Sequence, residues 1–161
     1  MSWLYLWGNI MSHTYSNNLF HIIFSVKDRC SLIADAWQEE LYRYLTGIAR
    51  AAGCQVVSIG GVTDHIHILV LVKPSLAISD LIGKLKANSS RWMKERFQPV
   101  HGFQWQPGFS SFSVSRSVAP RVSDYIAGQA AHHSKVSFQQ ELSDFYNRHE
   151  IKYEPTELQG E

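Results

Sequence analysis

The order of hydrophobic and polar positions predicts four strands and four helices. Segments rich in β-branched and aromatic residues are typical of strands, and they cover residues 19–26, 54–59, 65–72 and 109–117. Hydrophobic residues at helical spacing predict helices over residues 34–52, 81–93, 120–132 and 138–146. Gly53 follows the first helix as a stop signal, and Pro120 stands in the first turn of the third, where proline is tolerated.

The predicted order of elements is β-α-β-β-α-β-α, with a further short helix at the end. A turn marked by Gly60, Gly61 and Asp64 joins the second and third strands, which predicts an antiparallel hairpin. We therefore expect an α+β fold of the ferredoxin-like or RRM-like split βαβ type. Its central antiparallel sheet would be covered by helices, with a C-terminal helix that carries Tyr125.

One domain accounts for nearly the whole chain, because no linker interrupts this pattern. We expect the domain to span residues 13–153. Residues 1–12 begin with apolar side chains but show neither the basic region nor the cleavage pattern of a signal peptide, which predicts a disordered arm or a spurious upstream start. Residues 154–161 form an acidic tail.

The cysteines and the hydrophobic runs indicate a cytoplasmic protein. Cys30 and Cys54 lie in different segments without CxxC spacing, which predicts free thiols in a reducing compartment. No apolar run reaches the roughly 18 residues that cross a bilayer, so we expect no membrane contact.

Charge is distributed unevenly, although the net charge is only +1. Between residues 84 and 121 there are seven basic residues against one acid, and from residue 141 onward six acids against two basic residues. A basic stretch of this kind can bind phosphate groups, or it can be the solvated face of a helix. The candidate DNA contacts in it are Lys84, Lys86, Arg91, Lys94, Arg116 and Arg121.

A pair of histidines begins the third predicted strand. Alternate side chains of a strand share a face, so His65 and His67 point the same way and Ile66 points the other. Two imidazoles so placed can bind one metal ion. Partly buried, hydrogen-bonded histidines are the alternative. Asp64 precedes the pair and can orient an imidazole or belong to the turn.

Tyr125 and Gln129 lie four residues apart in the predicted third helix and therefore share one of its faces. A tyrosine can act as a nucleophile, but its pKa near 10 means that it needs help from a metal or a base. The carbonyl oxygen of Gln129 can serve as a third metal ligand. A tyrosine packed into the core beside a polar glutamine is the alternative.

Other candidates carry a weaker signal. His132 and His133 can bind a metal, but at a helix end they more often interact with carbonyl groups or with the helix dipole. Trp92, Trp105 and Phe109 can stack on unpaired bases, although core packing is the more common role. The sequence has no P-loop, no GxSxG, no zinc-finger spacing and no HExxH, which argues against those enzyme classes.

Five motifs together resemble the single-tyrosine HUH transposases of the insertion-sequence-200 type. They are HIIFSVKDR (residues 21–29), GGVTDHIHILV (60–70), KANSSRWMKE (86–95), FQWQPGFSSFSVS (103–115) and YIAGQAAHHSKVSFQQE (125–141). They follow one another in the family's order and span nearly the whole chain. This joint occurrence is far more specific than any single motif.

The resemblance implies a mechanism and a set of roles. His65 and His67 would be the histidines of the HUH motif, Gln129 the third ligand of Mg²⁺ or Mn²⁺, and Tyr125 the nucleophile. Tyr125 would attack a phosphate of single-stranded DNA, leaving a 5′-phosphotyrosine link and a free 3′-OH. Members of the family act as homodimers on hairpins at the element ends, commonly with the tyrosine of one subunit beside the histidines of the other.

The chain departs from the family at two positions, and it leaves three alternatives open. Gly128 stands where the family often has asparagine, and Phe109 where tyrosine is common; a glycine inside a helix costs about 1 kcal/mol relative to alanine. The alternatives are a domesticated relative that cuts chromosomal repeat hairpins, a catalytically silent hairpin-binding protein, and a small metal-binding protein unrelated to DNA.

Overall fold

A four-stranded antiparallel sheet forms the centre of the protein. The structure, a computed structural model, describes residues 15–97 and 102–154. The strands are β1 (Leu19–Ser25), β2 (Gln55–Gly61), β3 (His65–Leu71) and β4 (Ser110–Ser113), in the order β2-β3-β1-β4. Every neighbouring pair is antiparallel, which confirms the split βαβ fold expected from the sequence.

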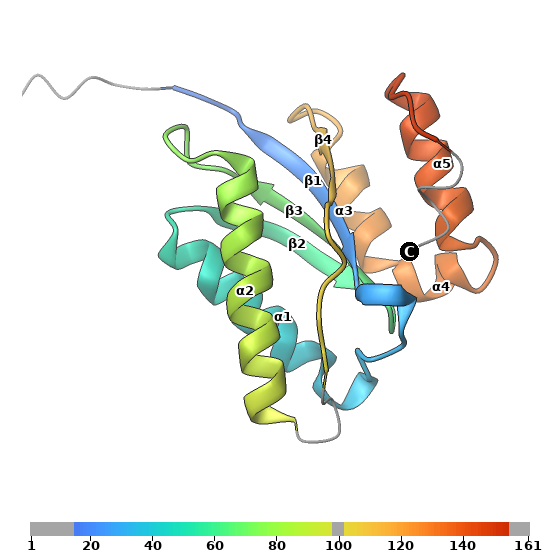
Figure 1. Ribbon diagram of the computed structural model, residues 1–161. Coiled ribbons are helices and arrows are strands. Elements are labelled where there is room, and N and C mark those ends of the chain that lie inside the picture. Colours follow the sequence, from blue (N-terminus) through green and yellow to red (C-terminus); the bar gives the residue numbers. More distant parts are fainter. Residues whose placement is uncertain (1–14, 98–101, 155–161) are drawn as a thin grey trace, which may run out of the picture.

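Helices cover both faces of this sheet (Figure 1). On one face lie α1 (Asp35–Ala51) and α2 (Ile78–Arg96), and on the other lie α3 (Ala119–Ala127), α4 (Gln129–His133) and α5 (Phe138–Arg148). A short 3-10 turn, η1 (Lys27–Arg29), follows β1. Among the described residues no helix is both long enough and apolar enough to span a bilayer.

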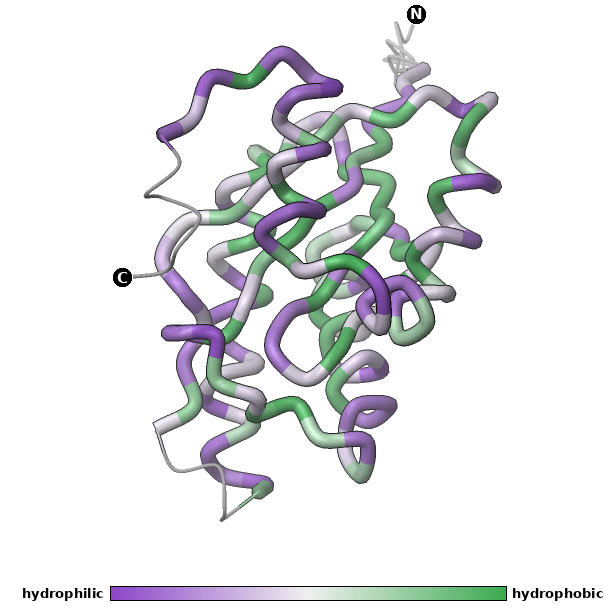
Figure 2. Tube along the Cα trace, turned by 90° about the vertical axis from the view of Figure 1, so that its right-hand side faces the viewer, coloured by the Kyte–Doolittle hydropathy of each residue, from purple (hydrophilic) through white to green (hydrophobic). Residues whose placement is uncertain are grey.

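Alternation along β1 and β3 divides the two layers. Ile66 and Ile68 of β3 belong to the main core under α1 and α2, whereas Leu69 packs with α3 on the opposite face. Figure 2 shows how the hydrophobic positions gather in the central strands while the helices alternate with polar positions. His65 and His67 therefore lie on the α3 face, as their spacing in the sequence predicts.

Several predicted boundaries differ from the structure. The expected helix over residues 120–132 is broken at Gly128, which ends α3 and precedes α4, because glycine disfavours the helix interior. The expected strand over residues 109–117 shrinks to Ser110–Ser113. Gly60 and Gly61 belong to β2, so the turn begins only after them. The predicted arm at residues 1–12 and residues 155–161 of the predicted tail lie outside the described residues.

Gly60 allows α3 to lie directly on the sheet. A Cβ atom at this position would overlap the carbonyl oxygen of Ile126 in α3, and that oxygen belongs to rigid helix backbone. Ile126 is itself fully buried against Leu69. The missing side chain of Gly60 therefore fixes how closely the helix that bears Tyr125 approaches β2.

We expect Gly60→Ala to destabilise the protein by about 1–3 kcal/mol, the usual cost of inserting a methyl group where there is no room. Urea unfolding measures this loss. Gly47→Ala in α1 is the matched control, because nothing lies within 4 Å of the Cβ it adds. That control should stabilise the protein by about 0.5–1 kcal/mol, since alanine favours a helix. Equal effects of the two substitutions would contradict the close approach.

Candidate metal centre

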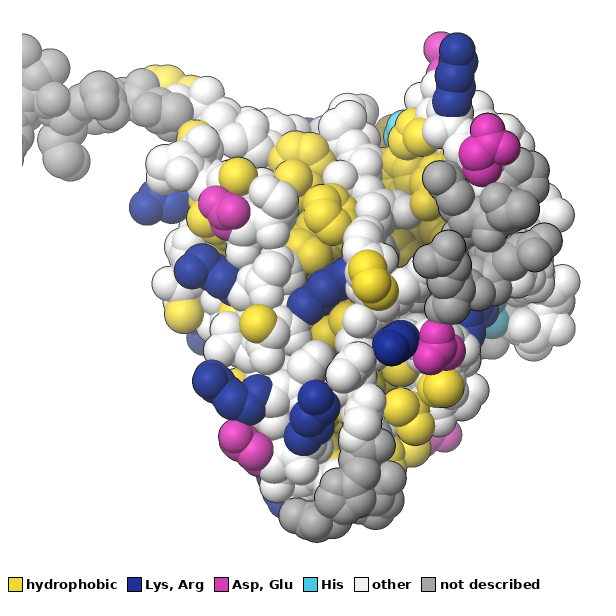
Figure 3. Space-filling view, in the orientation of Figure 1, with side chains coloured by type: hydrophobic (Ala, Val, Ile, Leu, Met, Phe, Trp, Pro, Cys, Tyr) yellow, Lys and Arg dark blue, Asp and Glu magenta, His cyan; other side chains and the backbone are white. Residues whose placement is uncertain are grey.

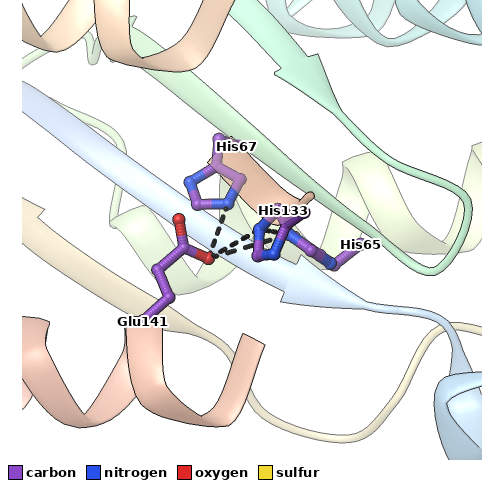
Figure 4. Close-up of side chains that lie close together, drawn as sticks. All are labelled: His65, His67, His133 and Glu141. Atoms are coloured by element: carbon purple, nitrogen blue, oxygen red, sulfur yellow. Dashed lines mark hydrogen bonds and ion pairs between the residues drawn. The ribbon is translucent and has the colours of Figure 1, made fainter. Parts of the chain in front are cut away.

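Four side chains from three elements converge on one point of the α3 face (Figure 4). His65 and His67 come from β3, His133 from the end of α4 and Glu141 from the first turn of α5. One ligand atom from each side chain lies within 4.8 Å of the others. Two ligands that are each about 2 Å from one ion are at most about 4 Å apart, so the observed spacing is close to that of a metal site. His65, His67 and Glu141 are at most 2% exposed.

The hydrogen bonds of two imidazoles leave their Nε2 atoms facing each other. His65 Nδ1 donates to Asp64 Oδ1 at 2.7 Å, and His133 Nδ1 donates to the Val136 carbonyl at 2.9 Å. The two Nε2 atoms are 2.9 Å apart, and in neutral rings both carry lone pairs. Because such lone pairs repel, the arrangement requires either a second proton on His133 or a cation between the rings.

Unsatisfied polar atoms at the same point also fit a cation. His67 Nε2, Gln129 Oε1 and Glu141 Oε2 are buried and have no hydrogen-bond partner among the described residues. Buried polar atoms are nearly always paired, and an ion is one explanation for exceptions. Glu141 Oε2 lies 3.4 Å from His67 Nε2 and 3.1 Å from His133 Nε2. The residues present therefore fit a divalent metal ion.

Burial keeps the strand imidazoles neutral. It lowers the pKa of His67 to about 4 and also lowers the pKa of His65, and the nearby carboxylates only partly oppose this. Burial on its own would raise the pKa of Glu141 and lower that of His133, but the close contact between the carboxylate and this imidazole outweighs burial, so the pKa of Glu141 is lowered and that of His133 is raised. Neutral imidazoles and a carboxylate are the protonation states that bind a metal.

Tyr125 joins the cluster from α3. Its hydroxyl donates to Glu141 Oε1 and lies 3.3 Å from His132 Nε2, and its ring centroid is 6.0 Å from that of His67. Burial and the hydrogen bond to Glu141 raise the pKa of Tyr125, so the phenol is protonated at neutral pH. A single chain thus brings the predicted nucleophile beside its own histidines.

Gln129 lies next to the carboxylate at the start of α4. It is 1% exposed, and its Nε2 donates to Glu141 Oε1 at 3.2 Å. Its Oε1 is one of the unpaired buried atoms of the site. The predicted third ligand is therefore at the cluster, but His133 and Glu141 surround the same point, and the role of Gln129 stays a prediction.

Asp64 holds the first imidazole in place. It accepts from His65 Nδ1, and on its other oxygen it accepts from Arg29 Nε at 3.0 Å and Nη2 at 2.8 Å. Burial would raise the pKa of Asp64, but these hydrogen bonds outweigh it and lower the pKa to about 2. The carboxylate therefore fixes the tautomer of His65 with Nε2 turned to the cluster.

We expect Asp64→Asn to lower Mn²⁺ affinity by about 10–100-fold, the usual cost of losing a partner that orients a metal-bound histidine. Isothermal titration with Mn²⁺ measures the change. Glu95→Gln, which removes an exposed carboxylate from α2, is the control and should leave the affinity unchanged. An unaltered affinity in Asp64→Asn would mean that Asp64 only supports the turn.

The predicted DNA contacts divide between the two layers. Lys84, Arg91 and Lys94 are exposed on α2, on the face of the sheet opposite the histidines, whereas Arg121 is exposed on α3. Arg116 is exposed in the loop before α3. Lys86 is half-buried and donates to the carbonyl groups of Gln106 and Gly108, and burial lowers its pKa to about 8. Lys86 thus supports a loop.

Sequence reasoning gave His133 only as a weaker metal-ligand candidate and did not single out Glu141. His133 was expected to act on the helix end, and its Nδ1 does bond the Val136 carbonyl, yet its Nε2 faces His65. Glu141 stood out in the sequence only as one of the acids near the C-terminus. The available signal was their position in the last motif that resembles the transposase family, eight and sixteen residues after Tyr125.

The aromatic candidates and the cysteines have distinct environments. Trp105 is buried in the core, where its indole N–H donates to Ser89 Oγ at 2.8 Å, and Trp92 stacks on Tyr44. Phe109 is 41% exposed, so core packing is wrong for this residue. Both cysteines are free thiols, as expected from their spacing.

Comparison of the sequence with known families and proteins gives consistent matches. The family described as "Transposase IS200 like" matches residues 14–129. The ISDra2 transposase TnpA of Deinococcus radiodurans is 28% identical over 115 residues, which are 68% of this chain and 82% of that protein. The transposase for insertion sequence element IS200 of Salmonella typhimurium is 26% identical over 125 residues, or 74% of this chain and 81% of that protein.

Solved structures show the same fold. The crystal structure of a candidate transposase from Deinococcus radiodurans superposes with a TM-score of 0.60 at 26% identity, over 73% of this chain and 94% of that one. A REP-associated tyrosine transposase bound to a REP hairpin superposes with a TM-score of 0.58 at 14% identity, over 77% of this chain and 73% of that one.

Proposed function

This chain belongs to the family of IS200-like transposases, and from that premise we propose that it nicks and rejoins single-stranded DNA with Tyr125 as the nucleophile. The observation that carries the proposal is the meeting of Tyr125 with a buried cluster of metal-binding side chains. A tyrosine of high pKa needs help to attack phosphorus, and a cation site beside it can supply that help.

His65, His67, His133 and Glu141 would hold a divalent metal, with Gln129 as a further oxygen donor. When bound, the ion supplies positive charge that polarises the scissile phosphate. An imidazole-rich set favours transition metals, so of the two ions expected from the family resemblance Mn²⁺ fits better than Mg²⁺. To bind an oxygen of the scissile phosphate, the metal ion needs an open coordination position. One of the weaker protein ligands would therefore have to leave the ion.

Tyr125 would form a bond from its phenol oxygen to phosphorus while the bond from phosphorus to the 3′ oxygen breaks. The phenol proton would pass to Glu141, which already accepts its hydrogen bond. The leaving 3′ oxygen would take a proton from solvent water and become a 3′-OH, and the DNA would remain attached through a 5′-phosphotyrosine. Attack by another 3′-OH reverses the bonds and joins two strands without an external energy source.

We propose hairpins near the ends of a mobile element as the substrate, because a relative of this fold is described as bound to a REP hairpin. A homodimer is also proposed, as the family resemblance implies. The single chain nevertheless places Tyr125 beside its own cluster, so one chain suffices for the arrangement described above. A DNA substrate makes the cytoplasm the proposed compartment.

Two other functions share these residues. A domesticated relative that cuts repeat hairpins would use the same chemistry, and a silent hairpin-binding protein would use the fold without it. The buried, unpaired ligand atoms of the cluster favour an active enzyme over the silent protein, because a binding surface alone gives no reason to keep them.

The test is a covalent protein–DNA band on a denaturing gel, after incubation with labelled single-stranded DNA that carries the element's own ends. We expect the band with Mn²⁺ and its loss with a chelator. Native gels with the same DNA measure binding in parallel. Binding without any covalent band in the presence of metal would favour the silent hairpin-binding protein.

A further inference from the structure

A second pocket lies beside the histidine cluster, between the end of β1, residues 106–110 and α5. We infer that it binds one unpaired pyrimidine base, that of the nucleotide next to the scissile phosphate. The inference rests on the proposed function, because it takes single-stranded DNA as the substrate. No residue of the metal cluster lines this pocket, so it is a separate site.

The strand register places this pocket one strand away from the histidines. Ser25 of β1 pairs with His65, and Ile23 pairs with His67 on one side and with Ser110 of β4 on the other. Ser25, Ile23 and Ser110 line the pocket. Because neighbouring strands are about 4.8 Å apart, the pocket is one nucleotide, and not several, away from the cluster.

The size of the pocket suits a single ring. Its volume is about 160 Å³, and a cavity of roughly 150 Å³ is known to hold one benzene molecule. A pyrimidine has one ring, whereas a purine has two fused rings. The dimensions therefore favour a pyrimidine base.

Aromatic side chains form the walls, and one of them links the pocket to the cluster. Phe138 stacks on the His65 ring with centroids 4.1 Å apart. The Arg29 guanidinium lies over the Phe138 ring, 4.2 Å from the centroid of that ring. Phe109 also lines the pocket and is 41% exposed. Unpaired bases stack on exposed aromatic rings in proteins that bind single strands, and Phe109 is such a ring, whereas Phe138 is covered by His65 and Arg29.

The polar groups of the pocket offer hydrogen-bond donors. Ser25 Oγ donates to Gln106 Oε1, which fixes the amide and leaves its Nε2 without a partner among the described residues. Asp64 accepts hydrogen bonds from Nε and Nη2 of Arg29. The Nη1 atom of Arg29 has no hydrogen-bond partner in the described part of the chain. Donors of this kind match the carbonyl oxygens of thymine and cytosine.

The loop that carries Gln106 and Phe109 is held in place before any ligand arrives. Lys86 Nζ donates to the backbone carbonyl of Gln106 at 2.8 Å and to that of Gly108. The backbone N–H of Gln106 donates to the backbone carbonyl of Ser25 at 2.9 Å. Such preorganisation lowers the ordering cost of binding.

Two larger pockets adjoin this loop, and Phe109 lines both. One is bounded by α2, and the other by β4 and residues 151–153. Figure 3 shows hydrophobic side chains in the hollows on this face, with Lys and Arg side chains over α2 beside them. A single strand can therefore continue from the base pocket past Phe109 toward either neighbour.

The test compares binding of fluorescently labelled dT, dC and dA hexanucleotides to the full chain carrying Tyr125→Phe, which cannot react with them. We expect both pyrimidine oligonucleotides to bind more tightly than dA. Phe109→Ala should weaken dT binding about tenfold, in the range that loss of one stacked base produces. Gln106→Leu should reduce the preference for dT over dA, because it removes a hydrogen-bond donor, while the size of the pocket keeps part of that preference.

Val57→Ala on β2 is the matched control, since Val57 is also 41% exposed and lies away from the pocket. The inference is overturned if Phe109→Ala behaves like this control, or if Gln106→Leu keeps the full wild-type preference. A photo-crosslink from a 5-iodouracil oligonucleotide to wild-type protein gives a readout that needs no variant. It should map to Phe109, Phe138 or Tyr146, and a crosslink elsewhere counts against the pocket.

These outcomes are separate from those of the proposed function. If wild-type protein forms the covalent band but shows no base preference, the base-pocket inference is wrong and the proposed enzymatic function stands. If the base preference depends on Phe109 and Gln106 but the protein never forms the covalent band, the base-pocket inference stands and the proposed enzymatic function is wrong.

Discussion

Replacing Tyr125 with phenylalanine should abolish the covalent protein–DNA species while leaving DNA binding nearly unchanged. Phenylalanine keeps the ring, which lies near His67 and Phe145, and removes only the oxygen that attacks phosphorus. No other tyrosine hydroxyl among the described residues contacts the cluster. Denaturing gels measure the covalent species, and fluorescence anisotropy with the same DNA measures binding.

Tyr44→Phe is the control for this prediction. Tyr44 stacks on Trp92 in the layer opposite the cluster, so its hydroxyl has no part in the reaction. The control should form the covalent species at the wild-type rate. A covalent species that persists in Tyr125→Phe would assign the nucleophile to another residue.

Removing a ligand of the cluster should have the second large effect. His67→Ala should lower Mn²⁺ affinity by more than the roughly 10–100-fold that an outer partner of the metal costs. Glu141→Ala should do the same, because it removes the only carboxylate of the cluster. Isothermal titration with Mn²⁺ measures both. His149→Ala is the control, since that imidazole packs against Phe112 outside the cluster, with the two rings tilted.

Gln129→Ala decides between two sets of ligands. The family resemblance makes Gln129 the third ligand, whereas the structure places His133 and Glu141 around the same point. If His133→Ala and Glu141→Ala weaken Mn²⁺ binding more than Gln129→Ala, the four-residue cluster is the resting metal site. If only Gln129→Ala weakens Mn²⁺ binding, then His133 at the end of α4 and Glu141 in α5 surround the site without binding the ion.

Local periodicity was sufficient for the fold and for the strand-borne half of the site. The alternation in HIHILVL places His65 and His67 on one face of β3, and nothing else in the fold alters that. The helix after Pro120 also brings Tyr125 to the histidine face, as the family resemblance implies.

The other half of the site depends on contacts that no local pattern encodes. His133 and Glu141 reach the cluster because the chain reverses after α4 and because α5 then packs on β1 and β4 through Phe138 and Leu142. Gly128 divides the continuous helix that periodicity predicts into α3 and α4, and the spacing of hydrophobic residues alone does not show this break. The close approach at Gly60 is likewise visible only once α3 lies on the sheet.

Mass spectrometry of the trapped adduct tests the central claim most directly. The covalent species is digested with nuclease and then with trypsin, which cleaves after Arg121 and Lys135 and releases a peptide whose only tyrosine is Tyr125. We predict a nucleotide on that peptide, with fragment ions that assign it to Tyr125. A nucleotide attached to any other residue would contradict the account.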